Sequence, residues 1–206
     1  AAWTDKSISV YLNDELIPYS NFKEYVAMYL GDNDSYPRIH QKINDRWEIV
    51  ATVNSDEKFE HVSFVNGINT SRGGTHVDYI ADQIKIKLAE MIKKKKKIDV
   101  KPQIIKNQLR LFVNAKKIIN PVFDSQTKET LKTPKTKFGS SIEISEKFIA
   151  QLIKTDIFDK IQAQAAYKDS QLLSKTDGKK SKKVKVNKLS DANKAGTIDS
   201  RKCTII

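Results

Sequence analysis

A short polar run carries the side chains best suited to chemistry on a phosphate. Gln126, Thr127 and Lys128 stand side by side in the segment FDSQTKE at residues 123–129. The amide and the ammonium can donate jointly to one phosphate, and the compact lysine charge would stabilise negative charge that develops there. A solvated turn explains the same residue types, so the run by itself leaves both interpretations open.

A run of five lysines is the second group with an obvious ligand. Adjacent like charges repel one another, and a phosphate backbone would neutralise them, so the run predicts a contact with nucleic acid. The alternative is a solvated loop whose lysines interact with the dipole at the C-terminal end of the preceding helix. The residues concerned are Lys93, Lys94, Lys95, Lys96 and Lys97.

A glycine pair stands just before a predicted helix. Gly73 and Gly74 precede Thr75, and glycines in this position can expose backbone N–H groups to an anion. The favoured interpretation is a tight connection in which Thr75 caps the helix. His76 has no second metal ligand close to it in the sequence, so no metal site is expected.

The charge balance indicates a polyanionic partner. The 206 residues include 37 Lys and Arg against 25 Asp and Glu, and the resulting net charge of +12 favours nucleic acid. The single cysteine, Cys203, excludes an intrachain disulfide framework and a cysteine-rich zinc site. The sequence has no apolar stretch approaching the roughly 18 residues of a membrane span. It also lacks a phosphate-binding glycine loop and a recognisable catalytic triad, so neither a membrane partner nor a complete catalytic site is expected.

The elements that must position these residues follow from hydrophobic periodicity. Alternating apolar residues predict a strand and hairpin at residues 7–14, and helical spacing between Asn21 and Gly31 predicts a short capped helix. Residues 47–53 and 61–65 are rich in β-branched and aromatic side chains, and we expect them to pair as antiparallel strands. The remaining predicted elements are a long helix at 77–92, a strand at 109–114 and a helix starting at 145 and continuing past 161.

This order of elements predicts the fold class. Strands, a helix, a strand and a helix in succession favour an α+β fold, a two-layer α/β sandwich with one sheet and helices on one face. After residue 167 the chain turns polar, with six lysines between residues 179 and 188, and this composition predicts a linker. The last residues, KCTII, have the pattern of a buried strand that stops before any turn, so we expect a piece of a longer protein.

Several motifs, taken together and in order, resemble the eukaryotic type IIA DNA topoisomerase family. They are SFVNGINT at 63–70, GGTHV at 73–77, IKN at 105–107 before LFVN at 111–114, and NPVFDSQTKE at 120–129. The motifs KLSDANKAGT at 188–197 and KCTII at 202–206 resemble the segment that leads into that family's metal-binding Toprim domain. The likeness covers most of the chain.

The resemblance implies a domain organisation. The main body would be the family's transducer, with the fold of the second domain of ribosomal protein S5 and a left-handed βαβ crossover. The implied segments are an N-terminal hairpin entering the transducer at 1–20, the transducer at 21–167, a lysine-rich linker at 168–187 and the start of the Toprim domain at 188–206.

The resemblance also implies roles for the two polar groups. The family's Gln-Thr-Lys loop contacts the γ-phosphate of ATP held in a neighbouring ATPase domain, and this carries onto Gln126, Thr127 and Lys128. The family's lysine-rich loop contacts double-stranded DNA, which carries onto Lys93, Lys94 and Lys95, with Lys96 and Lys97 as extensions. ATP and Mg²⁺ would be bound mainly by parts of the enzyme outside this chain.

We therefore expect the transducer of an ATP-dependent type II DNA topoisomerase, an isomerase that couples ATP hydrolysis to DNA passage through a double-strand break. The resemblance implies a homodimer formed through the rest of the enzyme and a nuclear location, or a cytoplasmic one if the protein is virus-encoded. One alternative is a standalone basic nucleic-acid-binding module with no ATP coupling. A bacterial gyrase-type enzyme is a second alternative.

Overall fold

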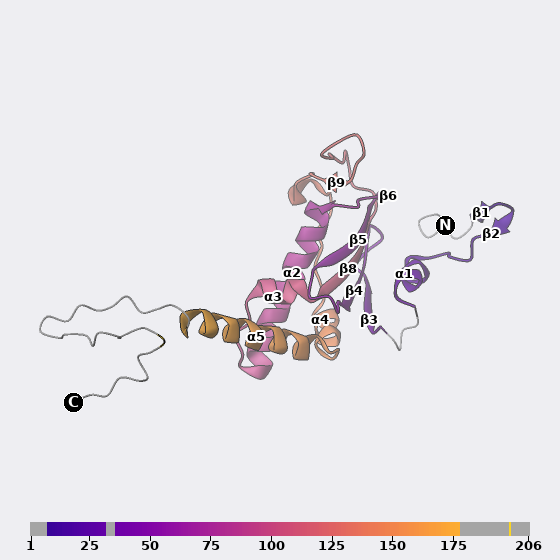
Figure 1. The fold of residues 1–206 in the computed structure, drawn as a ribbon. Coiled ribbons are helices and arrows are strands. Elements are labelled where there is room, and N and C mark those ends of the chain that lie inside the picture. The colour runs from indigo at the N-terminus through magenta and orange to yellow at the C-terminus, as the bar shows by residue number, and fades with distance from the viewer. Residues whose placement is uncertain (1–7, 32–35, 178–197, 199–206) are drawn as a thin grey trace, which may run out of the picture. The chain divides into compact units, whose positions relative to one another are not determined.

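The computed structural model describes residues 8–31, 36–177 and 198, and their helices and strands appear in Figure 1. The elements are β1 (Tyr11–Leu12), β2 (Glu15–Leu16), α1 (Phe22–Leu30), β3 (Arg38–Lys42), β4 (Trp47–Val53), β5 (Glu60–Val65), β6 (Ile68–Asn69), β7 (Gly73–Gly74), α2 (Thr75–Lys96), α3 (Pro102–Asn107), β8 (Leu109–Ala115), β9 (Thr130–Leu131), a 3-10 turn (Lys135–Lys137), α4 (Glu146–Ile153) and α5 (Ile157–Asp177).

The central sheet has five strands in the order β3-β4-β8-β5-β6. The predicted direct pairing of residues 47–53 with 61–65 is wrong, because β8 lies between these two strands. β4 pairs with β8 in antiparallel orientation and β5 pairs with β8 in parallel orientation. Parallel neighbours need a long crossover, and α2 with α3 supplies it. β8 takes the central position because six of its seven residues are buried, which leaves no face for solvent.

One face of this sheet forms the main core with α2. Ile80, Ile84 and Leu88 recur at helical spacing, and all three are fully buried against strand residues such as Ile49 and Leu111. Helical periodicity therefore predicted both the existence of α2 and its buried side. These observations confirm the predicted α+β class.

The opposite face of the sheet is covered by α1, whereas the prediction placed helices on one face only. A separate apolar cluster joins the helix to the outward-facing side chains of β4, β5 and β8, as Figure 1 shows from the position of α1 across the sheet from α2. Its buried members are Phe22, Val26, Leu30, Val50, Phe64 and Phe112.

The ends of α1 follow the sequence prediction. Asn21 is the N-cap, and its side-chain oxygen accepts a hydrogen bond from the Glu24 N–H at 3.0 Å. Gly31 is the C-cap, with a positive φ of 67° that glycine adopts at little cost. The predicted N-terminal hairpin is also present, and its turn residues Asn13 and Asp14 both have positive φ, as a two-residue hairpin turn requires.

Two predicted helix boundaries are wrong. α2 continues to Lys96, so the lysine run belongs to its last turn and C-cap and is not a loop after the helix. The single helix predicted from residue 145 is two helices, α4 and α5, separated by residues 154–156. The Thr155 hydroxyl donates to the Leu152 carbonyl at 2.6 Å, and such a local side-chain bond competes with helix continuation.

The chain divides into two compact units, residues 1–167 and 168–206. α5 continues through Asp177, so the first ten residues of the predicted linker are helical. The six lysines between residues 179 and 188, Cys203 and the segment assigned to the Toprim domain lie outside the described residues, except for Ile198. In the part of the chain that is described, no helix combines the length and apolar character needed to cross a membrane.

Candidate functional site

The loop that carries Gln126, Thr127 and Lys128 is a closed turn between β8 and β9. Its neck is held by the Asp124 N–H donating to the Thr130 carbonyl at 3.1 Å and by the Thr130 N–H donating to the Asp124 carboxylate at 3.2 Å. Desolvation raises the pKa of Asp124, but the hydrogen bonds from Thr130 and backbone groups, together with the charge of Lys132, lower it by more, so the net shift is downward and the group stays a carboxylate. The three candidate side chains at the tip are exposed.

Lys128 has an unusual backbone within this turn. Its N–H donates to the Ser125 carbonyl at 3.1 Å, and its φ is 57°, a left-handed conformation that non-glycine residues seldom adopt. Such conformations cost about 1 kcal/mol or more and cluster at functional sites. Among the described residues, no carboxylate lies within ion-pair distance of the Lys128 ammonium, which therefore remains available to an anion.

The loop is tied directly to the start of α2. Gly73 pairs with Thr130 and Gly74 pairs with Leu131, in a two-stranded parallel contact between β7 and β9. A Cβ on Gly74 would lie 2.2 Å from the Leu131 carbonyl oxygen, so only glycine permits this approach. We call this contact the β7–β9 joint, and it fixes the base of the loop to the first turn of the long helix.

The glycine pair is therefore a structural joint, which confirms the predicted tight connection, whereas the predicted anion contact and the predicted Thr75 cap are wrong. The Gly73 N–H already donates to the Thr70 carbonyl at 2.9 Å, so it does not face an anion. Thr75 is not the cap, because the N-cap is Gly74 and makes no side-chain bond there. The Thr75 hydroxyl instead donates to the Thr133 carbonyl at 2.7 Å, which adds a further tie between α2 and the segment after the loop.

Arg46 is a positioning residue that the sequence analysis missed. Its guanidinium donates to the carbonyls of Phe138 at 2.7 Å and Gly139 at 2.6 Å, and also to the carbonyls of Lys116 and Lys117. It thus holds the beginning of the loop segment against the turn that follows β9. No local pattern identifies such a residue, since its partners lie 70 to 93 residues further along the chain.

A chain of buried polar side chains lies beneath the β7–β9 joint. The Ser63 hydroxyl is 2.7 Å from the Thr70 hydroxyl, which in turn lies 3.2 Å from Nε2 of His76. Burial, together with the smaller effect of nearby His61, lowers the pKa of His76 to about 3, so this ring is neutral at physiological pH. Within the described ranges, no three His, Cys, Asp or Glu side chains gather as a metal site.

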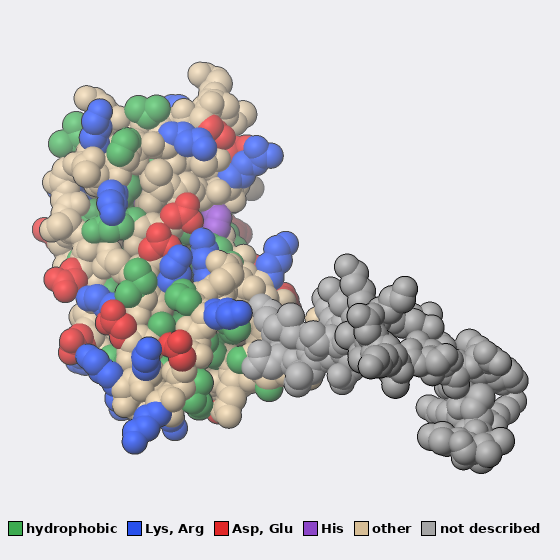
Figure 2. Space-filling view, turned by 90° about the vertical axis from the view of Figure 1, so that its left-hand side faces the viewer, with side chains coloured by type: hydrophobic (Ala, Val, Ile, Leu, Met, Phe, Trp, Pro, Cys, Tyr) green, Lys and Arg blue, Asp and Glu red, His purple; other side chains and the backbone are tan. Residues whose placement is uncertain are grey.

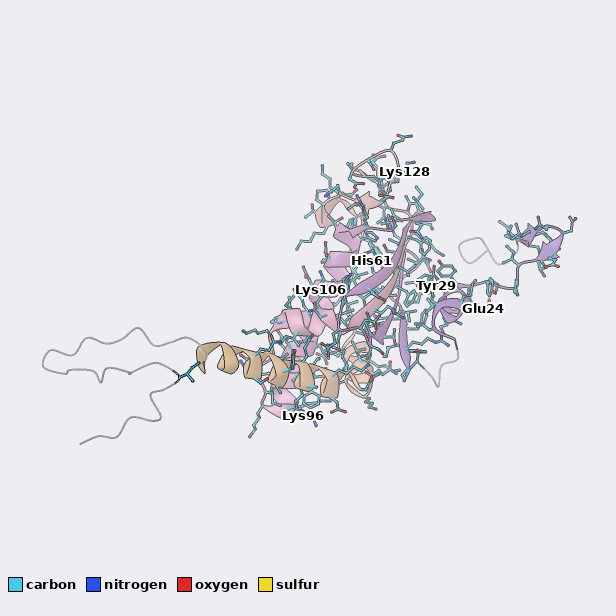
Figure 3. The ribbon with its side chains drawn as sticks, viewed as in Figure 1. Glu24, Tyr29, His61, Lys96, Lys106 and Lys128 are labelled. Atoms are coloured by element: carbon cyan, nitrogen blue, oxygen red, sulfur yellow. The ribbon has the colours of Figure 1, made fainter. Side chains whose placement is uncertain are left out.

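The lysine run lies at the other end of α2. The helix has 22 residues, which corresponds to a length of about 33 Å at 1.5 Å per residue. Figure 3 shows Lys128 and Lys96 at opposite ends of the described body. Lys97 ends the helix in the left-handed region, and its N–H donates to the Lys93 carbonyl at 3.0 Å. All five lysines are exposed.

The excess positive charge does not by itself locate a site. Figure 2 shows that acidic side chains are interspersed among lysines and arginines over the face that it presents. The helix end differs because consecutive lysines coincide there with the negative end of the α2 dipole. The structure therefore brings the predicted phosphate contacts onto two ends of one helix and does not gather them in a single pocket.

A comparison with known protein families shows which family the chain belongs to. The family model described as DNA gyrase B matches residues 21–181, which is most of the sequence. The chain belongs to the DNA gyrase B family. This confirms the resemblance to the type IIA topoisomerase family.

Curated relatives of the gyrase B-family chain include eukaryotic DNA topoisomerase 2 proteins. DNA topoisomerase 2 of Pisum sativum is 44% identical over 207 residues, which are 98% of this chain and 14% of the relative. DNA topoisomerase 2 of Drosophila melanogaster is 44% identical over 213 residues, which are 100% of this chain and 15% of the relative. The chain thus spans about one seventh of the length of these proteins.

Solved structures give the same assignment. The ATPase region of Saccharomyces cerevisiae topoisomerase II is 43% identical with a TM-score of 0.68, and the match covers 77% of this chain and 40% of that one. The ATPase and transducer domains of Balamuthia mandrillaris DNA topoisomerase II are 39% identical with a TM-score of 0.70, covering 81% and 41%. Fold and sequence therefore agree on the same family.

Proposed function

We propose that this chain is the transducer region of an ATP-dependent DNA topoisomerase 2, which couples ATP binding and hydrolysis to DNA passage through a double-strand break. Family membership supports the enzyme class, and one structural observation supports the coupling role. The β7–β9 joint attaches the loop bearing Lys128 to the first residue of α2, whose last turn bears the lysine run. In this proposal residues 21–167 are the transducer.

The loop is the nucleotide contact in this proposal. Gln126, Thr127 and Lys128 are exposed at its tip, where the amide and ammonium can donate to the γ-phosphate of a nucleotide bound in a separate domain. The described residues hold no group of three His, Cys, Asp or Glu side chains that could bind a metal. In this proposal the rest of the ATP site and its Mg²⁺ belong to other parts of the enzyme. When the terminal phosphate leaves, Lys128 loses a charge-assisted set of hydrogen bonds.

The lysine run is the DNA contact in this proposal. Five exposed ammonium groups at the end of α2 suit a polyanion such as duplex DNA, because neutralising its phosphates releases condensed counterions. The residues are Lys93, Lys94, Lys95, Lys96 and Lys97.

The coupling follows from the rigidity of α2. A change in the loop acts on the β7–β9 joint and thereby on the N-terminal end of the helix, while DNA acts on its C-terminal end. A packed helix transmits displacement because its buried side cannot deform continuously. The complete enzyme is proposed to be a homodimer through its other domains and to work in the nucleus, or in the cytoplasm if it is virus-encoded.

Replacing Lys128 tests the proposal. In the complete enzyme, Lys128→Ala should lower ATP turnover and strand passage about tenfold or more, because a donor to the terminal phosphate is removed. DNA cleavage should remain close to wild type, since no cleavage residue is changed. Lys132→Ala is the matched control, because Lys132 is an exposed lysine just beyond the loop. Unchanged ATP turnover in the Lys128 variant would contradict the proposed role.

The net charge of +12 supports one other candidate, a basic nucleic-acid-binding module without ATP coupling. That candidate predicts salt-sensitive duplex binding by this chain alone and indifference of binding to Lys128→Ala and to ATP. The two functions are therefore separated by the same variant.

A further inference from the structure

The five lysines of the run have different surroundings. The Lys96 ammonium lies 5.0 Å from the centroid of the Phe158 ring, within cation–π range. The Lys93 ammonium lies 3.4 Å from the Asp99 carboxylate, but both groups are largely exposed, so this pair contributes little. Among the described residues, Lys94, Lys95 and Lys97 have no ion pair or aromatic ring within reach.

Phe158 is a fixed platform for Lys96. It belongs to the first turn of α5 and packs, half-buried, against the main core, and its neighbour Ile157 is fully buried. Figure 3 shows Lys96 at the end of α2, close to the beginning of α5. Because the Phe158 ring is already held by the core, the contact with Lys96 costs the ring little conformational entropy.

A second contact holds α5 two turns further on. Gln164 is almost completely buried, and its amide nitrogen donates to the Glu57 carboxylate at 3.1 Å. The Gln108 amide donates in turn to the Gln164 side-chain oxygen at 3.2 Å. The amide chain ties α5 to residues that flank the sheet, Gln108 just before β8 and Glu57 between β4 and β5. The Lys96 contact joins α5 to the end of α2 that bears the lysine run.

We propose that Lys96, although part of the run, is a positioning residue that joins the end of α2 to α5. The phosphate contacts are made by Lys94, Lys95 and Lys97, together with Lys93, whose pair with Asp99 is weak. This inference rests on the proposed DNA role of the run and deepens it. Lys96 remains over Phe158 when DNA binds, so a force that DNA applies to the end of α2 reaches α5 directly.

The salt dependence of DNA binding separates the two kinds of lysine. The measurement is the DNA concentration that half-maximally stimulates ATP turnover of the complete enzyme, taken between about 50 and 200 mM salt. Each lost phosphate contact lowers the logarithmic salt slope by about 0.9, so the triple change of Lys94, Lys95 and Lys97 to Ala should lower it by about 2 to 3. Lys96→Gln should change the slope by less than about 0.5, well below the value for one contact.

Hydrogen exchange of α5 provides the complementary readout. Loss of an exposed cation–π contact should speed exchange of the backbone amides of residues 157–167 about two- to fivefold in Lys96→Gln. Lys96→Arg and Phe158→Tyr keep a cation and a ring and should stay near wild type. Phe158→Leu should speed exchange at least as much as Lys96→Gln, because it also removes aromatic packing against the core. The double variant Lys96→Gln with Phe158→Leu should be no worse than Phe158→Leu alone, because the leucine has already removed the contact of Lys96 with the ring.

The outcomes separate this inference from the proposed function. A slope change of about 0.9 in Lys96→Gln, α5 exchange equal to wild type, or additive effects in the double variant would each overturn the positioning role. If the triple variant leaves the slope and the stimulation unchanged, the proposed DNA contact of the run fails. In that case the exchange measurements still decide whether Lys96 holds α5.

Discussion

At the scale of single residues, burial governs the behaviour of His76. The ring is fully buried, and its Nε2 meets only the Thr70 hydroxyl at 3.2 Å. Desolvation therefore favours the neutral ring and holds its pKa at about 3, below the ordinary value of 6.5. His61 is partly buried, and desolvation lowers its pKa as well.

His76 should make folding sensitive to acid. Between pH 6.5 and about 3 the unfolded state protonates His76 while the folded state does not. The contribution of the neutral ring to the unfolding free energy is therefore complete above pH 6.5 and is lost as the pH falls toward about 3. Within that window one such group costs about 1.4 kcal/mol per pH unit. His76→Gln should flatten the dependence of the unfolding free energy on pH, measured by urea denaturation of the chain at about pH 7 and about pH 5. An unchanged pH dependence in the variant would rule out His76 as its source.

At the scale of elements, the β7–β9 joint decides where the loop stands. β7 has only two residues, and both are glycines whose backbones run against Thr130 and Leu131. A Cβ on Gly74 would lie 2.2 Å from the Leu131 carbonyl oxygen and 2.6 Å from its nitrogen, so the strands would have to separate. The joint therefore depends on the absence of a side chain.

Gly74→Ala should lower the unfolding free energy of the chain by about 3 kcal/mol or more, because it combines a backbone clash with a strained φ of 123°. Gly67→Ala is the control, since Gly67 also has a positive φ, 82°, but has open space around its Cβ position. It should cost only about 1 kcal/mol. Chemical denaturation of both variants gives the two unfolding free energies. Equal losses of unfolding free energy would show that the positive φ alone requires glycine at residue 74, and not the close approach of Leu131.

The same scale explains the arrangement of the strands. β4 and β5 each have the amino-acid composition of a strand, but β propensity does not determine which strand each one pairs with. β8 separates them because its nearly continuous burial suits the centre of a sheet better than an edge. Because β8 pairs in parallel with β5, α2 belongs to the crossover between these two strands. The N-terminal end of α2 lies beside the loop, and its C-terminal end carries the lysine run.

At the scale of the whole molecule, the lysine run should affect the ATPase only through DNA. With all five lysines from Lys93 to Lys97 changed to Ala, the complete enzyme should keep its basal ATP turnover and lose most of its stimulation by duplex DNA. The reason is that the run lies at the far end of α2, a helix about 33 Å long, from the loop. ATP turnover with and without DNA measures both quantities.

A charge-matched control removes the effect of net charge alone. Five exposed lysines on other elements can be changed together, and that variant should retain DNA stimulation. Persistent stimulation after loss of the run would leave it as a solvated helix end with no DNA role. The control residues are Lys23, Lys42, Lys58, Lys147 and Lys154.

The sequence by itself determined the α+β class, the capped α1, the buried side of α2, the N-terminal hairpin and the family resemblance. These features depend on periodicity, caps and turn residues within a few positions of each other, so local order reveals them. Only the tertiary structure decided that β8 separates β4 from β5, that Gly74 packs on Leu131, that Arg46 holds the loop and that Lys96 lies over Phe158. Each of these contacts joins residues distant in the chain, and their partners are selected by burial and close packing of the whole fold, which no local pattern records.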